Sequence, residues 1–490
     1  MAFAERTSKT AIGLPARHMN ESLIALARGR HFYVIGFGSV AQTALPLLVK
    51  TLALTQSQIT IIAPEASLVG DAAILGQHKC MALKQDNFYD CLAPILREGD
   101  VVLNLATDVN SCALIQLTQS LGALYLDTVI EPWGNWYANA DRTPDQRTNY
   151  VLREEALRIK GRATAVLTHG ANPGLVSHFA KLALIDVAKK AGLHVQPANR
   201  KEWALLACSL DLRLIQIAEY DSQQSIRIRQ TDQFLNTWSV AGFLAEACQP
   251  AELGWGTHEK DWPVDGRRHL NGCGAAIYLN RPGASVRVKS WVPGIGPYHG
   301  FLVTHGESIS LADYLTVCDN NDTPTYRPSV HYAYRPCDSA VASLHDLAGR
   351  HWDKTGMSQH VLMEDIVSGS DTLGVLLGYG ARGCYWYGSR LSVEQARSLI
   401  PGANATSMQV AAGVLAGLVW AMENPQRGVV EPEDMDSERV LEIARPWLGE
   451  MLGEFTDWNP LASASTLFAQ GEPKDIAAAD PWQFFQVRVN

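Results

Sequence analysis

The chain has 490 residues, 47% of them hydrophobic and 19% charged, with a formal net charge of −9 at pH 7. This length and composition predict two or three domains with large buried cores. The acidic balance disfavours a general nucleic-acid-binding protein, which would carry a basic surface. The N-terminus has no continuous apolar segment typical of a secretory signal, so we expect a cytoplasmic protein.

The cysteines and the longest apolar segment agree with this expectation. The nine cysteines include no C-x-x-C pair, which predicts reduced thiols and no metal site. The longest apolar helix candidate, 410–421, is shorter than the about 20 residues that a membrane span needs, so we expect no membrane association. Its Gly413-x-x-x-Gly417 spacing predicts close helix packing inside a core.

Residues 31–168 alternate predicted strands with predicted helices. The strands are expected at 31–35, 59–62, 101–103, 124–127 and 164–167, and the helices at 41–52, 88–96, 111–121 and 146–159. This alternation predicts an α/β fold with a Rossmann-type parallel sheet covered on both faces. Pro46 lies inside the first helix and is expected to kink or shorten it.

The pattern changes after residue 168. A predicted helix at 175–191 precedes strands at 214–218, 225–229, 275–279, 285–291 and 300–303, and helices follow at 338–350, 393–400 and 407–422. We therefore expect a Rossmann domain at 1–168 and a second, mixed α/β domain for substrate binding and dimerisation at 169–400. A C-terminal helical segment at 401–490 is expected to pack back on the Rossmann domain.

The clearest motif, Gly36-Phe-Gly38-Ser-Val-Ala41, follows the first predicted strand and begins a predicted helix. Gly36 would permit the tight turn, Gly38 would let the backbone approach phosphates, and Ala41 would let helix and strand pack closely. The helix N-terminus, with Ser39 and Val40, would bind the pyrophosphate. The motif predicts a dinucleotide site.

The residues after the second strand favour NAD. Ala63-Pro64-Glu65 follows the strand, so Glu65 stands two places after the usual acidic position and is expected to bind the ribose hydroxyls. No arginine follows closely to bind a 2′-phosphate, which favours NAD over NADP. Further expected cofactor contacts are Asn104, Thr128 and Pro173.

Polar and aromatic residues gather where predicted strands end, the edge at which open α/β sheets bind ligands. Asp108 and Glu131 follow two strands of the first domain, and Glu219 ends a strand of the second. Three more lie in later loops and strand ends: Trp238, Glu246 and His305. Neither an H-E-x-x-H nor a G-x-S-x-G motif is present, so we expect neither a metal centre nor a serine hydrolase.

Segments throughout the chain resemble those of bacterial homospermidine synthases, members of the saccharopine dehydrogenase-like superfamily. The matching segments are Ile35-Gly-Phe-Gly-Ser39, Asp127-Thr-Val-Ile-Glu-Pro-Trp133, His169-Gly-Ala-Asn-Pro-Gly174, Asn236-Thr-Trp-Ser-Val240, Gln249-Pro-Ala-Glu-Leu-Gly-Trp-Gly-Thr-His-Glu259, Gly300-Phe-Leu-Val-Thr-His305 and 410–425. The run ending in Glu259 is the most specific. The family commonly has Gly where this chain has Ala41, and Asp where it has Ala63.

The resemblance implies an NAD-dependent transferase that joins two putrescines to sym-homospermidine and releases ammonia. In this reaction, retained NAD oxidises one amine-bearing carbon to the imine. The amine of a second putrescine then displaces ammonia, and the retained NADH reduces the new C=N bond, so the net redox change is zero. The resemblance also implies a homodimer, with spermidine as a further candidate substrate beside putrescine.

The resemblance also implies roles for the polar residues, because a diamine in water is a dication that needs carboxylates and an aromatic face. Glu219 and Asp108 would anchor ammonium groups, and Trp238 would supply a cation–π face. His305, or a carboxylate beside it, would accept or relay protons. The other expected contacts of the substrate are Glu131, which we also expect to be catalytic, Asn172, Glu246 and Asp371.

Two other functions stay open. An NAD(P)-dependent saccharopine- or carboxynorspermidine-type dehydrogenase would consume its cofactor, and its substrates would require arginine or lysine for their carboxylates. A non-catalytic NAD sensor would not need converging acidic, aromatic and histidine side chains. The carboxylate-rich segments of this chain favour diamine substrates.

Overall fold

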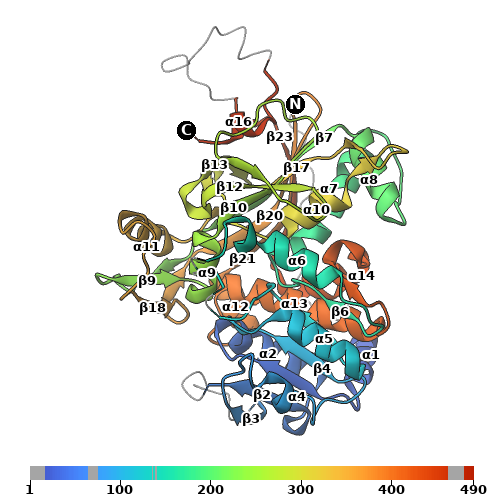
Figure 1. Cartoon of the computed structure of the whole chain (residues 1–490), viewed down its shortest axis with the longest axis vertical. Helices are drawn as coiled ribbons and strands as arrows, with labels where there is room; N and C mark the ends of the chain where they lie inside the picture. Colours follow the sequence, from blue (N-terminus) through green and yellow to red (C-terminus); the bar gives the residue numbers. More distant parts are fainter. Residues whose placement is uncertain are drawn as a thin grey trace.

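The computed structural model describes residues 17–64, 75–134, 136, 137, 139, 141–461 and 479–489. Its architecture consists of two large sheets and the helices around them (Figure 1). The N-terminal sheet with β2 and β4 occupies one end of the molecule, and a larger sheet with β12 and β17 occupies the other. The expected α/β fold is confirmed.

The first sheet is parallel throughout, with strand order β22-β6-β5-β4-β1-β2-β3. Its strands are β1 (Phe32–Ile35), β2 (Ile59–Ala63), β3 (Gln77–Cys80), β4 (Val101–Asn104), β5 (Leu124–Asp127), β6 (Ala165–Val166) and β22 (Val429–Val430). From β3 to β6 the order is that of doubly wound dinucleotide-binding sheets. The five predicted strands agree within one residue at each end, whereas β3 and β22 were not predicted.

The helices of this region are α1 (Arg17–Ala27), α2 (Ser39–Leu52), α4 (Phe88–Leu92), α5 (Ser111–Leu121) and α6 (Asn149–Leu157). Pro46 lies inside α2, which continues to Leu52, so the proline does not shorten the helix, and the alternative expectation of a kink stays a prediction. The helix keeps its length because it packs its buried apolar side chains against the core, including α13 (Ala405–Glu423).

The second sheet has ten strands and is mixed. Its main order is β11-β12-β10-β17-β7-β20-β21-β23, with β13 and β14 joined through β17, and β17 and β7 form its one parallel pair among the described residues. The strands are β7 (Leu212–Asp221), β10 (Pro250–Gly254), β11 (Gly266–Arg268), β12 (Ala276–Pro282), β13 (Arg287–Val292), β14 (Gly296–Phe301), β17 (Ser329–Arg335), β20 (Ser370–Tyr379), β21 (Gly383–Ser392) and β23 (Glu450–Thr456).

Shorter elements surround this sheet. The predicted strand at 225–229 is wrong, because β8 includes only Gln224–Ser225. The remaining strands are β9 (Gln233–Asn236), β15 (Val317–Cys318), β16 (Pro324–Tyr326), β18 (Ser358–Val361) and β19 (Ile366–Ser368). The remaining helices are α7 (Leu175–Lys190), α8 (Arg200–Ser209), α9 (Val240–Cys248), α10 (Glu307–Tyr314), α11 (Asp338–Gly349), α12 (Val393–Leu399), α14 (Ser437–Ala444) and α16 (Phe484–Val487).

Helix α13 lies between the two sheets, where it contacts β5 and β6 of the first and β20 and β21 of the second. It is long and apolar enough to cross a membrane, so the expectation of a shorter apolar helix is wrong, but 94% of its apolar window is buried inside the protein. At Gly413, a Cβ would overlap the carbonyl oxygen of Gly170. Gly413 therefore permits the close approach of the loop that begins at His169.

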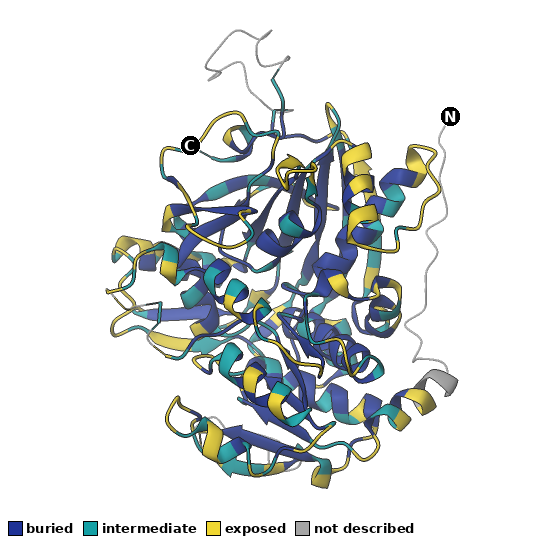
Figure 2. Ribbon diagram, turned by 45° about the vertical axis from the view of Figure 1, so that its right-hand side comes forward, coloured by how far each residue is buried: buried dark blue, intermediate teal, exposed yellow. Residues whose placement is uncertain are grey.

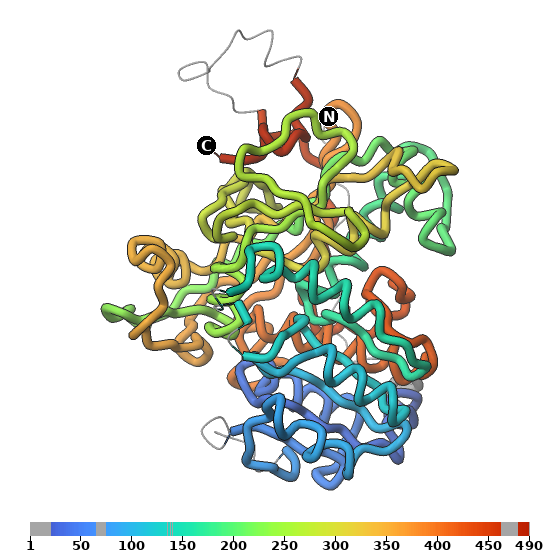
Figure 3. Tube along the Cα trace, viewed as in Figure 1, coloured from blue at the N-terminus to red at the C-terminus, as the bar shows by residue number. Residues whose placement is uncertain are grey.

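The chain after residue 400 contacts both sheets (Figure 3). Strand β22 extends the first sheet, and β23 extends the second. The segment 479–489 covers one face of the second sheet, where Trp482 and Phe484 pack with Trp386. Figure 2 shows that the strands of both sheets are mostly buried, while exposed residues gather on the outer helices and loops.

Candidate active site

A groove at the carboxyl ends of β1, β2 and β4 is lined in part by Gly36 of the glycine motif. Gly36 has φ +87°, and a Cβ there would lie 2.8 Å from the backbone of Ala106, so this turn requires glycine. Gly38 caps α2 without a side-chain hydrogen bond, and a Cβ there would meet no atom of the described residues within 4 Å. The first amide groups of α2, including that of Val40, therefore begin beside open space that fits an anion.

Ser39, the first residue of α2, adds a polar side chain at this helix N-terminus. Its hydroxyl is buried and has no hydrogen-bond partner among the residues that the structure describes. A buried hydroxyl at a helix N-terminus is a ready donor for a phosphate oxygen. The residues of this motif therefore fit the pyrophosphate of a dinucleotide.

A second pocket adjoins the groove and gathers most of the predicted site residues. Those that line it are Val40, Asn104, Thr128, Glu131, Asn172, Pro173, Glu219, Trp238, Glu246, His305 and Asp371. None of the described residues that line the pocket is lysine or arginine. The pocket therefore adjoins the expected dinucleotide site on one side. On the other side lie the acidic residues Glu219 and Asp371, here called the acidic wall.

The register of the second sheet places the acidic wall. Glu219 on β7 lies opposite Tyr334 on β17, and Asp221 lies opposite Asp371 on β20. Because side chains alternate along strands, Glu219, Asp221, Asp371 and Tyr334 share one face of the sheet. Glu219 and Asp371 are buried, and the hydroxyl of Thr406, at the start of α13, donates to Asp371 at 2.6 Å.

A hydrogen-bond chain joins Glu219 to His305. The Nδ2 amide of Asn172 donates to Glu219 Oε2 at 3.1 Å, and the Oδ1 of Asn172 lies 3.0 Å from His305 Nδ1. His305 Nε2 lies 3.1 Å from Glu246 Oε2, and its Nδ1 lies 3.4 Å from Glu307 Oε1. Since Asn172 Oδ1 and Glu246 can only accept, both ring nitrogens donate, and this arrangement holds His305 as an imidazolium.

The pKa directions follow from burial and from the excess of acidic groups. Burial raises the pKa of Glu219 to about 7, and it also raises that of Glu131, with a further contribution from Asp108. Burial and then the charges of Glu219 and Asp221 raise the pKa of Asp371 well above its ordinary value. The pocket therefore contains too few positive groups to neutralise its carboxylates, as expected of a site that binds cations.

His305 has the opposite balance. Burial alone lowers the pKa of His305, but the charges of Glu246 and Glu307 outweigh burial and raise it to about 10. At neutral pH, His305 therefore carries a positive charge and has no free ring nitrogen to accept a proton.

Trp238 lies on the wall beside these acids. It is half-buried and follows β9, and its Nε1 donates a hydrogen bond of 3.0 Å to the hydroxyl of Tyr334. Phe243 packs against both rings, at 5.3 Å from Trp238 and 5.5 Å from Tyr334. The indole is therefore held by the hydrogen bond of its N–H group and by ring packing, and its ring contributes to the pocket lining.

Two further acidic residues were predicted to belong to the site. Asp108 lines the neighbouring groove, and its backbone amide donates to the carboxylate of Glu131, so Asp108 lies beside the acidic wall but is not among its lining residues. Glu65 lies outside the described residues.

Several residues of the pocket were not predicted from the sequence. The hydroxyl of Tyr332 donates to Glu219 at 2.5 Å, and Thr406 binds Asp371. Tyr332 belongs to β17, which was not predicted, although the alternation Tyr332-Ala-Tyr334 was an available signal. Thr406 precedes the predicted start of its helix by one residue.

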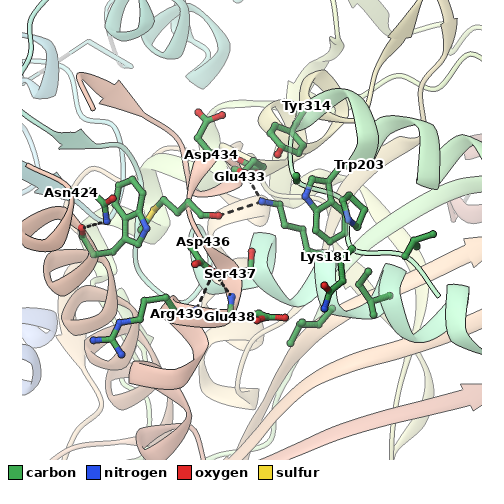
Figure 4. A pocket seen from close by; sticks show the side chains of 18 of the residues that line it. Lys181, Trp203, Tyr314, Asn424, Glu433, Asp434, Asp436, Ser437, Glu438 and Arg439 are labelled. Atoms are coloured by element: carbon green, nitrogen blue, oxygen red, sulfur yellow. Dashed lines mark hydrogen bonds between the residues drawn. The ribbon is translucent and has the colours of Figure 1, made fainter. Parts of the chain in front are cut away.

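A larger hollow of about 1050 Å³ lies elsewhere, between α7, α8 and α14 (Figure 4). Lys181 is buried there and donates to the backbone carbonyls of Glu433 and Met435, at 2.5 and 3.4 Å. Its Nζ lies 5.4 Å from the ring centre of Trp203 and 5.1 Å from that of Tyr314. None of the predicted site residues that the structure describes lines this hollow, so the candidate active site is the acidic pocket.

Two family models together match most of the chain. The saccharopine dehydrogenase NADP binding domain matches residues 32–168, which contain the glycine motif. The saccharopine dehydrogenase C-terminal domain matches residues 170–456, which contain Glu219, Trp238 and His305.

Individual proteins match nearly the whole chain. The chain is 46% identical over 467 residues to a homospermidine synthase of Blastochloris viridis, covering 93% of this chain and 96% of that protein. It is 44% identical over 470 residues to that of Mesorhizobium japonicum, with the same coverage of both proteins. The crystal structure of the Legionella pneumophila homospermidine synthase in complex with NAD superposes with a TM-score of 0.87 at 43% identity, covering 94% of this chain and 98% of that one. The chain therefore belongs to the homospermidine synthase family.

Proposed function

We propose that this chain transfers an aminobutyl group from one putrescine to another, forming sym-homospermidine and releasing ammonia. One observation carries the proposal: the pocket beside the dinucleotide groove is lined by Glu131, Glu219, Glu246 and Asp371, without lysine or arginine among its described lining residues. This lining suits a substrate with positive nitrogens at both ends.

NAD fits the groove through the glycine turn, the first amide groups of α2 and the hydroxyl of Ser39, which has no partner in the described part of the chain. When bound, NAD supplies the hydride acceptor and donor that the reaction needs. Asn104, Thr128 and Pro173 line the pocket next to this edge, which supports their proposed contacts with the cofactor.

Glu219 is proposed to manage the protons of the reacting amine. An amine must be neutral to act as a nucleophile, and a carboxylate with a pKa near 7 can accept its proton and return one to departing ammonia. Asn172 and Tyr332 both donate to Glu219 Oε2, so the other oxygen, Oε1, is left for the substrate. Trp238 would stabilise the ammonium by a cation–π contact.

His305 is proposed to position the site as a fixed cation. Through Asn172 it orients an amide donor toward Glu219, and its charge lowers the pKa of Glu219. Glu131, Glu246 and Asp371 are proposed to hold the distal ammonium groups of the substrates, and Asp108 lies close enough to Glu131 to act on its charge. A dry pocket would limit hydrolysis of the imine.

A saccharopine- or carboxynorspermidine-type dehydrogenase is the alternative, and the same lining disfavours it. Such substrates carry carboxylates, which would be repelled by Glu131, Glu219 and Asp371. The pocket also brings acids, Trp238 and His305 together beside the cofactor edge, an arrangement that an NAD sensor does not require.

We also propose a cytoplasmic homodimer. All nine cysteines lie in the described residues and are free thiols, which supports a reducing compartment. The proposed units remain a Rossmann domain at 1–168, a substrate and dimerisation domain at 169–400 and a C-terminal segment at 401–490. Sedimentation equilibrium of the full chain would test the dimer, which a monomer at micromolar concentration would contradict.

The activity is tested with purified protein, putrescine and NAD alone. We expect homospermidine and ammonia in equal amounts by mass spectrometry and ammonia assay, without net NADH. Accumulation of NADH with no triamine would favour a dehydrogenase, and neither product would favour a sensor. Spermidine in place of one putrescine tests the wider substrate range.

A further inference from the structure

Two tyrosines of β17 form a stacked pair under the pocket. Tyr332 and Tyr334 are two residues apart and therefore point to the same face of the sheet. Their ring centres are 5.1 Å apart with an interplanar angle of 9°, and both side chains are buried. Because β17 pairs with β7, β10 and β14, this pair stands on a strand held from both sides.

Each hydroxyl of the pair contacts one group of the proposed ammonium site. Tyr332 donates to Glu219 Oε2 at 2.5 Å, and Tyr334 accepts from Trp238 Nε1 at 3.0 Å. A carboxylate and an indole face must be correctly spaced to bind the same ammonium. The stacked tyrosines join these two groups through one rigid strand.

We propose that Tyr332 and Tyr334 are positioning residues that fix the carboxylate of Glu219 and the indole of Trp238 relative to each other, and so set the ammonium site between them. The inference rests on the proposed function, because it assigns the pair to the binding of a diamine.

The indole needs such a restraint. Rotation about the bond that carries an aromatic ring has broad, roughly two-fold minima, so packing alone allows more than one ring orientation. Phe243 packs against both Trp238 and Tyr334, but it supplies no hydrogen bond to the indole. The hydroxyl of Tyr334 therefore selects one orientation of Trp238, which a phenylalanine at 334 would not do.

A double-mutant cycle separates positioning from packing. Tyr334→Phe is expected to lower kcat/KM for putrescine about three- to tenfold, the usual effect of one lost hydrogen bond. Trp238→Phe removes the N–H donor, so adding Tyr334→Phe to that variant is expected to have no further effect. Equal losses in both backgrounds would overturn the role of Tyr334.

Tyr332 is tested through the pH profile. Its hydrogen bond lowers the pKa of Glu219, so Tyr332→Phe should move the acidic limb of kcat/KM to higher pH. Added to the Glu219→Gln variant, the same substitution should leave the pH profile of kcat/KM unchanged. An unmoved limb in Tyr332→Phe, or a further effect when it is combined with Glu219→Gln, would overturn its role.

The matched control is Tyr326→Phe, which removes a tyrosine hydroxyl bonded to the backbone carbonyl of Leu212, away from the pocket. It should lower the melting temperature about as much as Tyr334→Phe while leaving kcat/KM unchanged. A matching loss of kcat/KM in Tyr326→Phe would show a general effect of destabilisation and would overturn the inference.

The affinity of each variant of the double-mutant cycle for putrescine is also measured, by calorimetry on the NAD-loaded protein. If the wild type binds putrescine but makes no homospermidine, the proposed activity fails, while the cycle still tests the tyrosines through binding. A wild type that neither binds nor converts putrescine contradicts both. Additive losses in an active enzyme contradict the positioning role alone.

Discussion

His305 and Glu246 are joined across the pocket by a contact of 3.1 Å between Nε2 and Oε2. The other ring nitrogen faces the carbonyl oxygen of Asn172 at 3.0 Å. One imidazolium therefore lies among several acids, and it neutralises only part of their charge. The pocket keeps an excess of carboxylates, which a diamine in its charged form can neutralise.

This charge balance predicts the pH dependence of the enzyme. Glu219, whose pKa is raised to about 7, must be ionised to bind or deprotonate an amine, so kcat/KM should rise with pH and level off above about 7. Substituting His305→Gln removes a charge that lowers the pKa of Glu219 and should move this limb to higher pH. Initial rates of the wild type and of His305→Gln from pH 5.5 to 9 would measure this shift of kcat/KM. A limb at the same pH in both proteins would contradict the role of His305.

Glu219→Gln should lower kcat/KM for putrescine by at least about a hundredfold, because a buried charge pair with the substrate is lost. The fold should persist, since glutamine retains the shape of the side chain. The matched control, Glu454→Gln, changes an exposed glutamate of β23 in the same sheet and should leave kcat/KM unchanged. Wild-type turnover of Glu219→Gln at low putrescine would remove Glu219 from the proposed mechanism.

Trp238→Ala should reduce activity far more than Trp238→Phe. A cation–π contact contributes about 0.5–2 kcal/mol, so losing the ring should cost roughly two- to thirtyfold in putrescine affinity. Phenylalanine keeps a ring face and loses only the N–H bond to Tyr334. Calorimetric titration with putrescine measures the difference, and equal losses in the two variants would mean that the ring only packs.

The buried acids also predict how stability depends on pH. The folded pKa values of Glu219 and Asp371 are raised, so their contribution to the free energy of unfolding is present at low pH and is lost as pH rises, for Glu219 as pH passes through about 7. His305 acts in the same direction, because its stabilising contribution is present below about 6.5 and is lost as pH rises through about 10.

Without putrescine, the melting temperature should therefore fall between pH 6 and pH 8.5, and it should fall less in Glu219→Gln. Added putrescine should raise the melting temperature more at pH 8 than at pH 6, because it binds the ionised acids. Differential scanning fluorimetry at matched ionic strength measures both. A larger putrescine effect at pH 6 would contradict the proposed excess of carboxylates.

Five strands of the first sheet were predictable because their signals are local. Each of these five is a short apolar run, and Gly36 and Gly38 stand at the turn that a dinucleotide requires. The pairing of β22 with β6 was not predictable, because it joins Val429 to Ala165 across more than half of the chain and depends on α13 filling the space between the sheets. Such long-range pairing leaves no periodic pattern in either segment.

The sequence was sufficient to predict which residues line the site. It was not sufficient to predict the hydrogen bonds that join them. Glu219, Trp238 and His305 line one pocket, as expected from strand ends and from the family resemblance. The charge of His305 could not be predicted, because it depends on Glu246, which is 59 residues away in the sequence, and on the orientation that the fold gives to Glu307. Tyr332 was missed for the same reason, since its hydroxyl matters only through its contact with Glu219.

The most direct measurement uses putrescine deuterated on both amine-bearing carbons, with unlabelled NAD and excess unlabelled NADH in solution. If a retained cofactor removes and returns the same hydride, mass spectrometry should find homospermidine that keeps every deuterium, with one ammonia released per triamine and no net change in NADH. Homospermidine that has lost one deuterium, with label in the free cofactor, would contradict a retained cofactor. Production of labelled NADH without any triamine would contradict the proposed function itself.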